Sequence, residues 1–229
     1  PHEAPEKKSP TAFRWFYEGR KKDVPEPTPL PCEYGETYLD GLQTQSGKFE
    51  FDSSSLRRFG QDPERPPVNK YIPSWVGRQT TDLFKRFSLQ LISPHPRYSF
   101  HTKGDGKDST INDIIDHRVL VDGHYYWIAR MHPTEAEKRG IKQHDLVKLF
   151  NDRGTVICAA VLTERLLPGV IHSYESSANY EPIGDPGNSP DRGGCVNVLT
   201  PKRHMTEKTS ASAPNSCLIE VALWQGEAA

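Results

Sequence analysis

Polar residues gather in one short segment that directly follows an apolar, strand-like run. The segment 93–102 contains two histidines, one arginine, one tyrosine and three hydroxyl residues. Pro94 and Pro96 lack a backbone N–H and have a restricted φ, so this segment is predicted to be an extended or turning loop. Imidazole, guanidinium and hydroxyl groups suit a polar, anionic ligand. The alternative is a proline-rich connector whose polar groups are solvated.

Two later groups of polar residues could contact the same ligand. Tyr174 and Glu175 follow a predicted strand. Asn197 and Thr200 follow the glycine pair at 193–194, and their mixture of donors and acceptors suits the edge of a heterocycle. An Asx-type turn that closes a glycine-rich loop would explain Asn197 and Thr200 equally well.

No catalytic residue is predicted within this segment. The sequence has no G-x-S-x-G, H-E-x-x-H or Walker motif. Metal binding by His95 and His101 is rejected because no third ligand stands at a useful spacing. The cysteines form no C-x-x-C pair, which argues against a zinc knuckle or an iron–sulfur cluster within this segment; they are Cys32, Cys158, Cys195 and Cys217.

Composition limits the classes of partner. The chain has 229 residues, 34% of them hydrophobic, and a mean hydropathy of -0.70. No apolar run approaches the roughly 18 residues of a membrane span, and the formal charge of -1 argues against nucleic acid or an anionic membrane as a partner. Widely spaced cysteines favour a reducing, cytoplasmic compartment. The chain starts without methionine or a signal core, and together with the family resemblance given below this predicts a C-terminal piece of a larger protein.

The pattern of apolar residues predicts a mainly β fold after residue 86. Thr134–Glu137 has a capping-box pattern for a short helix that stops at Gly140. Asn151 and Asp152 are interpreted as residues of a hairpin turn rather than ligands. Several short strands with one short helix indicate a closed β-barrel. The predicted strands are Leu89–Ile92, Tyr125–Ala129, Leu146–Phe150, Val156–Leu162 and Leu218–Leu223.

Residues 1–86 hold more than half of the 20 prolines and few apolar runs. Phe49–Asp52 is predicted to be a short strand and Ser53–Arg58 a helical turn. We therefore expect an irregular arm from the preceding domain at 1–86, a barrel domain at 87–224 and a tail at 225–229.

Five blocks carry a resemblance to a known family. In order and spacing they resemble the C-terminal molybdopterin-dinucleotide-binding domain of the dimethyl sulfoxide reductase family; the blocks are 91–102, Asn151–Gly154, Leu166–Glu175, Gly193–Thr200 and Ala213–Val221. Leu42–Phe51 resembles the T-x-S-G-K-x-E segment that precedes that domain. The resemblance implies a six-stranded double-psi β-barrel of the aspartate-decarboxylase-like type.

The resemblance also implies the ligand and the residues that contact it. Two molybdopterin guanine dinucleotides would hold one molybdenum, whose protein ligand lies outside this segment. Partners would be the N-terminal domains of the parent large subunit and an iron–sulfur small subunit. The implied cofactor contacts are Ser93, His95, Arg97, His101, Thr102, Tyr174, Glu175, Asn197 and Thr200.

Four smaller motifs indicate a subfamily. His117-Arg-Val, Gly123–Trp127, Ser173–Ser176 and Asp191–Cys195 are similar to the large subunits of pyrogallol–phloroglucinol transhydroxylases, which act on polyhydroxylated aromatics. The alternatives are the same domain from another molybdopterin oxidoreductase, or a non-catalytic barrel module that has lost the cofactor.

Overall fold

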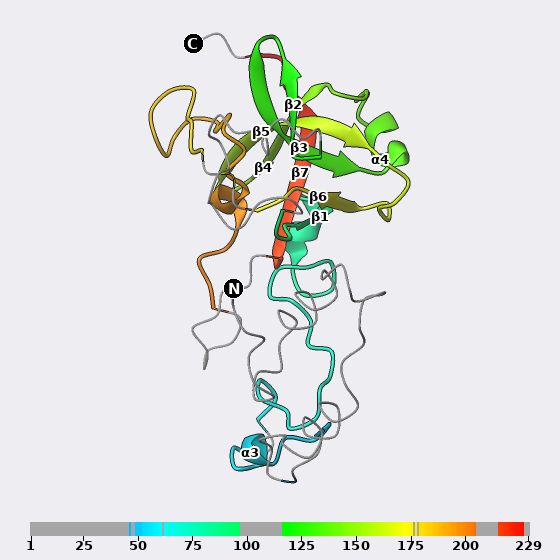
Figure 1. Ribbon diagram of the computed structural model, residues 1–229, viewed down its shortest axis with the longest axis vertical. Helices are drawn as coiled ribbons and strands as arrows, with labels where there is room; N and C mark the ends of the chain where they lie inside the picture. The colour runs from blue at the N-terminus through cyan, green and yellow to red at the C-terminus, as the bar shows by residue number, and fades with distance from the viewer. Residues whose placement is uncertain are drawn as a thin grey trace, which may run out of the picture. The chain divides into compact units, whose positions relative to one another are not determined.

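A computed structural model of the chain describes residues 46, 49–60, 62–96, 116–175, 177, 179–204 and 215–226 (Figure 1). The chain divides into two compact units, Pro1–Tyr71 and Ile72–Ala229. Three of the predicted cofactor contacts, Arg97, His101 and Thr102, lie outside the described residues.

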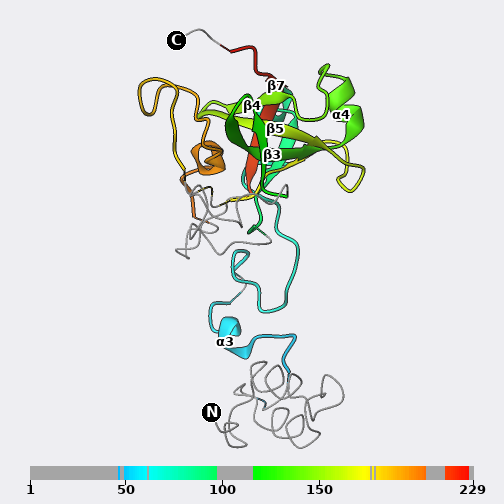
Figure 2. The ribbon, with the colours of Figure 1, turned by 45° about the horizontal axis from the view of Figure 1, so that its top comes forward.

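The second unit contains a closed barrel (Figures 1 and 2). Six strands follow one another around it in the order β3, β5, β4, β7, β1 and β6, and β6 pairs back with β3. The pairs β1–β6 and β3–β5 are parallel and the other barrel pairs are antiparallel. This arrangement confirms the predicted six-stranded barrel. The strands are β1 (Leu89–Ile92), β3 (His124–Met131), β4 (Leu146–Asn151), β5 (Gly154–Leu162), β6 (Val170–His172) and β7 (Cys217–Leu223).

The strands of the barrel share one apolar core. Along β1, buried Leu89 and Leu91 alternate with half-buried neighbours, which is the period of two that a strand requires. The middle of β5 is buried at every position from 156 to 160, so this strand is covered on both faces. Trp127 of β3 is among the largest fully buried side chains.

Within the described ranges, two hairpins connect neighbouring antiparallel strands. The predicted hairpin turn is present between β4 and β5, where Asn151 ends β4 and pairs with Gly154, so the loop consists of Asp152 and Arg153. The Asn151 amide donates to the carbonyls of Leu199 (2.9 Å) and Leu218 (3.1 Å), so this side chain supports the structure around the hairpin. The other hairpin pairs β3 with β2 (Arg118–Val121), a strand that the sequence analysis does not predict.

The short helix α4 (Pro133–Glu137) starts earlier than predicted. Its N-cap is His132, whose Nδ1 accepts a hydrogen bond from the backbone N–H of Thr134 at 3.2 Å. The capping-box prediction placed the cap at Thr134 and was wrong, because imidazole nitrogen can replace a hydroxyl as the capping acceptor. Pro133 then occupies the first turn, where its missing N–H has no cost.

Residues 72–86 belong to the same compact unit as the barrel. They include the 3-10 helix η1 (Asp82–Lys85), and the backbone N–H of Val76 donates to Ser216 Oγ at 2.7 Å. Arg86 forms an ion pair with Asp152 at 2.6 Å. The compact unit therefore extends to the N-terminal side of the first barrel strand.

In the first unit, helix α3 (Ser54–Arg57) forms where a helical turn is predicted, with Ser53 as its N-cap. The predicted strand at Phe49–Asp52 is reduced to a single bridge between Asp52 and Val68. No helix among the described residues of either unit is long and apolar enough to cross a membrane.

Candidate functional site

The parallel strands β1 and β6 end side by side, and the residues after them form the first part of the candidate site. Parallel pairing continues past the strands, because Ser173 N–H donates to Ile92 O and Glu175 N–H donates to Pro94 O, each at 3.1 Å. Proline has no backbone N–H to donate, but at this position the ladder uses only the carbonyl of Pro94 as an acceptor, so a proline is tolerated here. The two extensions bring Ser93 and His95 beside residues 174 and 175.

The side chains of His95 and Glu175 are in polar contact across these extensions. The distance from His95 Nδ1 to Glu175 Oε1 is 2.6 Å, and the side chains are 67% and 21% exposed. Contact with a carboxylate holds the imidazole in one orientation and places the proton on Nδ1. Both residues are predicted cofactor contacts, but the sequence gives no sign that they pair with each other.

Ser93 is buried at the start of the same loop. The residue is 2% exposed and its backbone N–H donates to Asn215 Oδ1 at 2.8 Å. Among the described residues its Oγ has no hydrogen-bond partner. A buried hydroxyl without a partner costs about 1–3 kcal/mol, so this atom is suited to bond with a ligand.

Tyr174 points away from Glu175 into a polar cluster that we call the Arg130 network: Asp116, Arg130, His172 and Tyr174. The Tyr174 hydroxyl donates to Asp116 Oδ2 at 3.0 Å. Arg130 donates to the carboxylate and to the backbone carbonyl of Asp116, the latter at 2.9 Å. Arg130 Nη1 also lies 3.2 Å from His172 Nδ1.

In the Arg130 network the positive Arg130 pairs with the negative Asp116, and His172 is neutral. A guanidinium can only donate, so His172 Nδ1 must be the acceptor and its ring is neutral. Burial and, after it, the neighbouring Arg130 charge lower the pKa of His172 to about 4, against the opposing effect of Asp116. Burial raises the pKa of the Tyr174 phenol, and the hydrogen bond to Asp116 also favours the protonated form.

A second part of the site is the loop that ends in the 3-10 helix η2 (Val196–Leu199). Asp191 is fully buried at its base. Its Oδ1 accepts from the backbone N–H groups of Glu181 (2.7 Å) and Gly193 (3.0 Å), and its Oδ2 accepts from that of Cys195 (2.7 Å). One carboxylate thus fixes both sides of the loop immediately before η2.

Asn197 and Thr200 lie in and just after η2. The Thr200 hydroxyl donates to the Asn197 carbonyl at 2.9 Å, and the Thr200 N–H donates to the same carbonyl at 3.2 Å. Both bonds go to the backbone carbonyl of Asn197, so they form a backbone turn and not the Asx-type turn, which would need the Asn197 side chain as acceptor. The Asn197 residue is exposed, and a cofactor contact by its side chain stays a prediction.

Trp127 connects the two parts. Its Nε1 donates to the Tyr174 carbonyl at 2.7 Å, inside the protein. On its other side it contacts Gly194, where an added Cβ would lie only 2.2 Å from Trp127 Cβ. Sequence reasoning missed the supporting residues Asp116, Arg130 and Asp191, because only the fold shows that they face inward.

Comparison with known proteins supports the resemblance. A family model described as Molydopterin dinucleotide binding domain matches residues 89–218. The chain belongs to this family. It is 47% identical over 227 residues to the pyrogallol hydroxytransferase large subunit of Pelobacter acidigallici, which covers 97% of this chain and 26% of that protein.

More distant relatives are reductases. A trimethylamine-N-oxide reductase of Haemophilus influenzae is 28% identical, over 85% of this chain and 23% of its own length. A dimethyl sulfoxide reductase of Escherichia coli is 35% identical, over 71% of this chain and 19% of its own length. The chain therefore spans about a quarter or less of these relatives.

A solved structure shares the fold. Acetylene hydratase from Pelobacter acetylenicus superposes with a TM-score of 0.56 at 15% identity, covering 78% of this chain and 24% of that one. Among the described residues no group of three or more histidine, cysteine, aspartate or glutamate residues could hold a metal ion.

Proposed function

We propose that this chain is the cofactor-binding, C-terminal part of a molybdenum enzyme whose large subunit resembles pyrogallol hydroxytransferase. The parent enzyme would transfer hydroxyl groups between polyhydroxylated aromatics. The observation that carries the binding role is the buried Oγ of Ser93, which has no hydrogen-bond partner among the described residues and lies where β1 and β6 end together. The 47% identity to the hydroxytransferase supports this substrate class over that of the reductases.

The described residues fit a molybdopterin dinucleotide. Ser93, His95 and Glu175 offer a hydroxyl, an imidazole and a carboxylate, which suit the donors and acceptors of pterin and guanine edges. Arg97, with His101 and Thr102, is proposed to contact the phosphates. The bound cofactor supplies the metal–dithiolene chemistry, while this chain holds and orients it. We propose no catalytic residue here and no activity for the segment alone.

Partners and compartment follow from the same proposal. The barrel would contact the N-terminal domains of its own large subunit, and an iron–sulfur small subunit would complete the enzyme. The described cysteines, Cys158, Cys195 and Cys217, are free thiols, which supports a reducing, cytoplasmic location.

Three measurements on the full-length native protein test the function. We expect bound molybdenum, a fluorescent pterin product after acid oxidation, and hydroxyl exchange between trihydroxybenzenes. Absence of both metal and pterin would support the alternative of a barrel that has lost its cofactor. Metal and pterin without hydroxyl exchange would instead indicate another molybdopterin oxidoreductase.

Replacing Ser93 with alanine should separate ligand binding from stability. The variant removes a buried hydroxyl that has no partner in the described part of the chain, so the melting temperature of the cofactor-free chain should stay equal or rise. Cofactor retention in the full-length enzyme should fall, because the hydroxyl would lose its contact with the ligand. Ser216→Ala is the comparison, since the hydroxyl of Ser216 accepts from Val76 N–H and its loss should lower the melting temperature. A cofactor-free Ser93→Ala chain that melts well below wild type would contradict the proposed contact.

A further inference from the structure

We propose that the Arg130 network is a positioning device that sets the His95–Glu175 pair for contact with the cofactor. Arg130, Asp116 and His172 would act through Tyr174, which becomes a positioning residue rather than a cofactor contact. The inference rests on the proposed function and assigns these side chains a role in it.

The side chains of the neighbouring residues Tyr174 and Glu175 point in opposite directions. Consecutive residues of an extended chain point to opposite sides. Tyr174 is 8% exposed and points into the network, while Glu175 points to the loop and meets His95. Any force that fixes the Tyr174 side chain and backbone therefore also fixes where Glu175 can lie.

Tyr174 is held by contacts to its hydroxyl, its backbone carbonyl and its ring. Its hydroxyl donates to Asp116, its carbonyl accepts from Trp127, and its ring packs edge-on against His172 with 4.7 Å between ring centres. The Arg130 guanidinium lies 4.9 Å from the centre of the same ring. These contacts come from β3, from β6 and from the residues just before β2, so one rotation of Tyr174 would disturb all three segments.

The charges of the Arg130 network balance one another. Arg130 is positive, Asp116 negative and His172 neutral, so the network as a whole is neutral where it borders a site for an anionic ligand. The Arg130 side chain is only 16% exposed, and its donors go to Asp116 and His172. A partly buried network whose donors and acceptors are all hydrogen-bonded holds its side chains in a single arrangement. A positioning role requires such rigidity.

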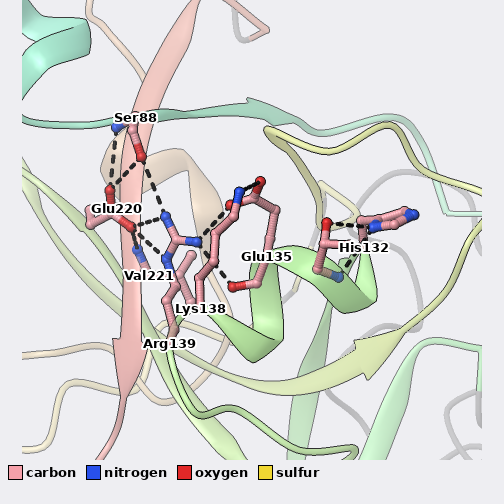
Figure 3. Close-up of polar contacts among 8 residues, drawn as sticks. Ser88, His132, Glu135, Lys138, Arg139, Glu220 and Val221 are labelled. Carbon is pink, nitrogen blue, oxygen red and sulfur yellow. Dashed lines mark hydrogen bonds and ion pairs between the residues drawn. The ribbon is translucent and has the colours of Figure 1, made fainter.

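The barrel also contains a matched control (Figure 3). Arg139, which follows α4, is likewise 16% exposed and pairs with Glu135 (2.7 Å) and Glu220 (2.6 Å). It also donates to Ser88 Oγ at 3.3 Å. Ser88 stands just before β1, whereas His172 of the Arg130 network pairs with Ile92 at the end of β1, so the two networks lie at opposite ends of this strand.

The experiment compares Arg130→Met with Arg139→Met in the full-length enzyme. Melting temperature reports stability, and the loss of molybdenum and pterin during gel filtration reports cofactor retention. Both variants should melt at lower temperature, because each leaves a partly buried carboxylate, Asp116 or Glu220, without its guanidinium partner. Only Arg130→Met should release cofactor about tenfold faster than wild type, which corresponds to about 1.4 kcal/mol.

Tyr174→Phe provides a second variant if Arg130→Met does not fold. It removes one hydroxyl and leaves the ion pair in place, and we expect faster cofactor release with a small change in melting temperature. His172→Asn keeps an acceptor for Arg130 and should retain cofactor. Equal release rates from Tyr174→Phe and wild type would overturn the inference. A wild-type enzyme without molybdenum would overturn the proposed function itself, and with it the inference.

Discussion

Replacing Gly194 with alanine is expected to destabilise the barrel by about 4 kcal/mol. Gly194 has a φ of +82°, which costs any L side chain energy. The added Cβ would also lie 2.2 Å from Cβ and 2.7 Å from Cγ of Trp127. Trp127 cannot move away freely, because it is 2% exposed and donates to the Tyr174 carbonyl. Urea unfolding of the 229-residue chain measures the loss.

Gly187→Ala is the matched control in the same loop. Its φ is +84°, yet an added Cβ would meet nothing within 4 Å. This variant should lose only the backbone contribution, about 1 kcal/mol. Equal losses in the two variants would mean that Trp127 and Gly194 do not pack tightly, and that the two parts of the site are not connected through Trp127.

The longer barrel strands could be predicted because their residues carry local signals, whereas β6 (Val170–His172) has only three residues and no bounds were predicted for it. Leu89–Ile92 alternates between buried and half-buried positions, and Val156–Leu162 is an apolar run of strand length. The hairpin at Asp152 and Arg153 was also predictable, since its loop chemistry is local. Strand β2 has only four residues, Arg118–Val121, and a pattern this short cannot be separated from an irregular segment.

The supporting residues of the site could not be predicted in the same way. Arg130 is 14 positions from Asp116 and 42 from His172, so no local pattern links them. In the sequence Asp191 resembles an ordinary loop aspartate beside glycines. The predicted contacts Ser93, His95 and Glu175 meet because β1 and β6 are parallel, and that is a property of topology rather than of spacing. The family resemblance supplied this topology; the residue pattern alone supplied only a closed barrel.

Asp191→Ala is expected to cost about 4 kcal/mol or more, because it leaves three backbone donors without their acceptor. The N–H groups of Glu181, Gly193 and Cys195 all point at this carboxylate, which is fully buried. Hydrogen bonds to a charged group contribute about 1.5–3 kcal/mol each, although losses within one network do not simply add. Asp191→Asn should cost less, about 2 kcal/mol, since one amide oxygen still accepts while the NH₂ group faces a donor.

Asp185→Ala is the comparison for the same loop. Residue 185 is exposed, and its backbone carbonyl accepts from the backbone N–H groups of Asn188 and Ser189. Removing its side chain should change stability by no more than about 0.5 kcal/mol. Urea unfolding gives the free energies, and hydrogen exchange at the Gly193 and Cys195 amides shows where the structure opens. If Asp191→Ala matched Asp185→Ala in both measurements, the Asp191 carboxylate would not hold the loop. The placement of η2 and Asn197 would then depend on the packing of Val196 and Leu199 alone, both of which are buried in the core.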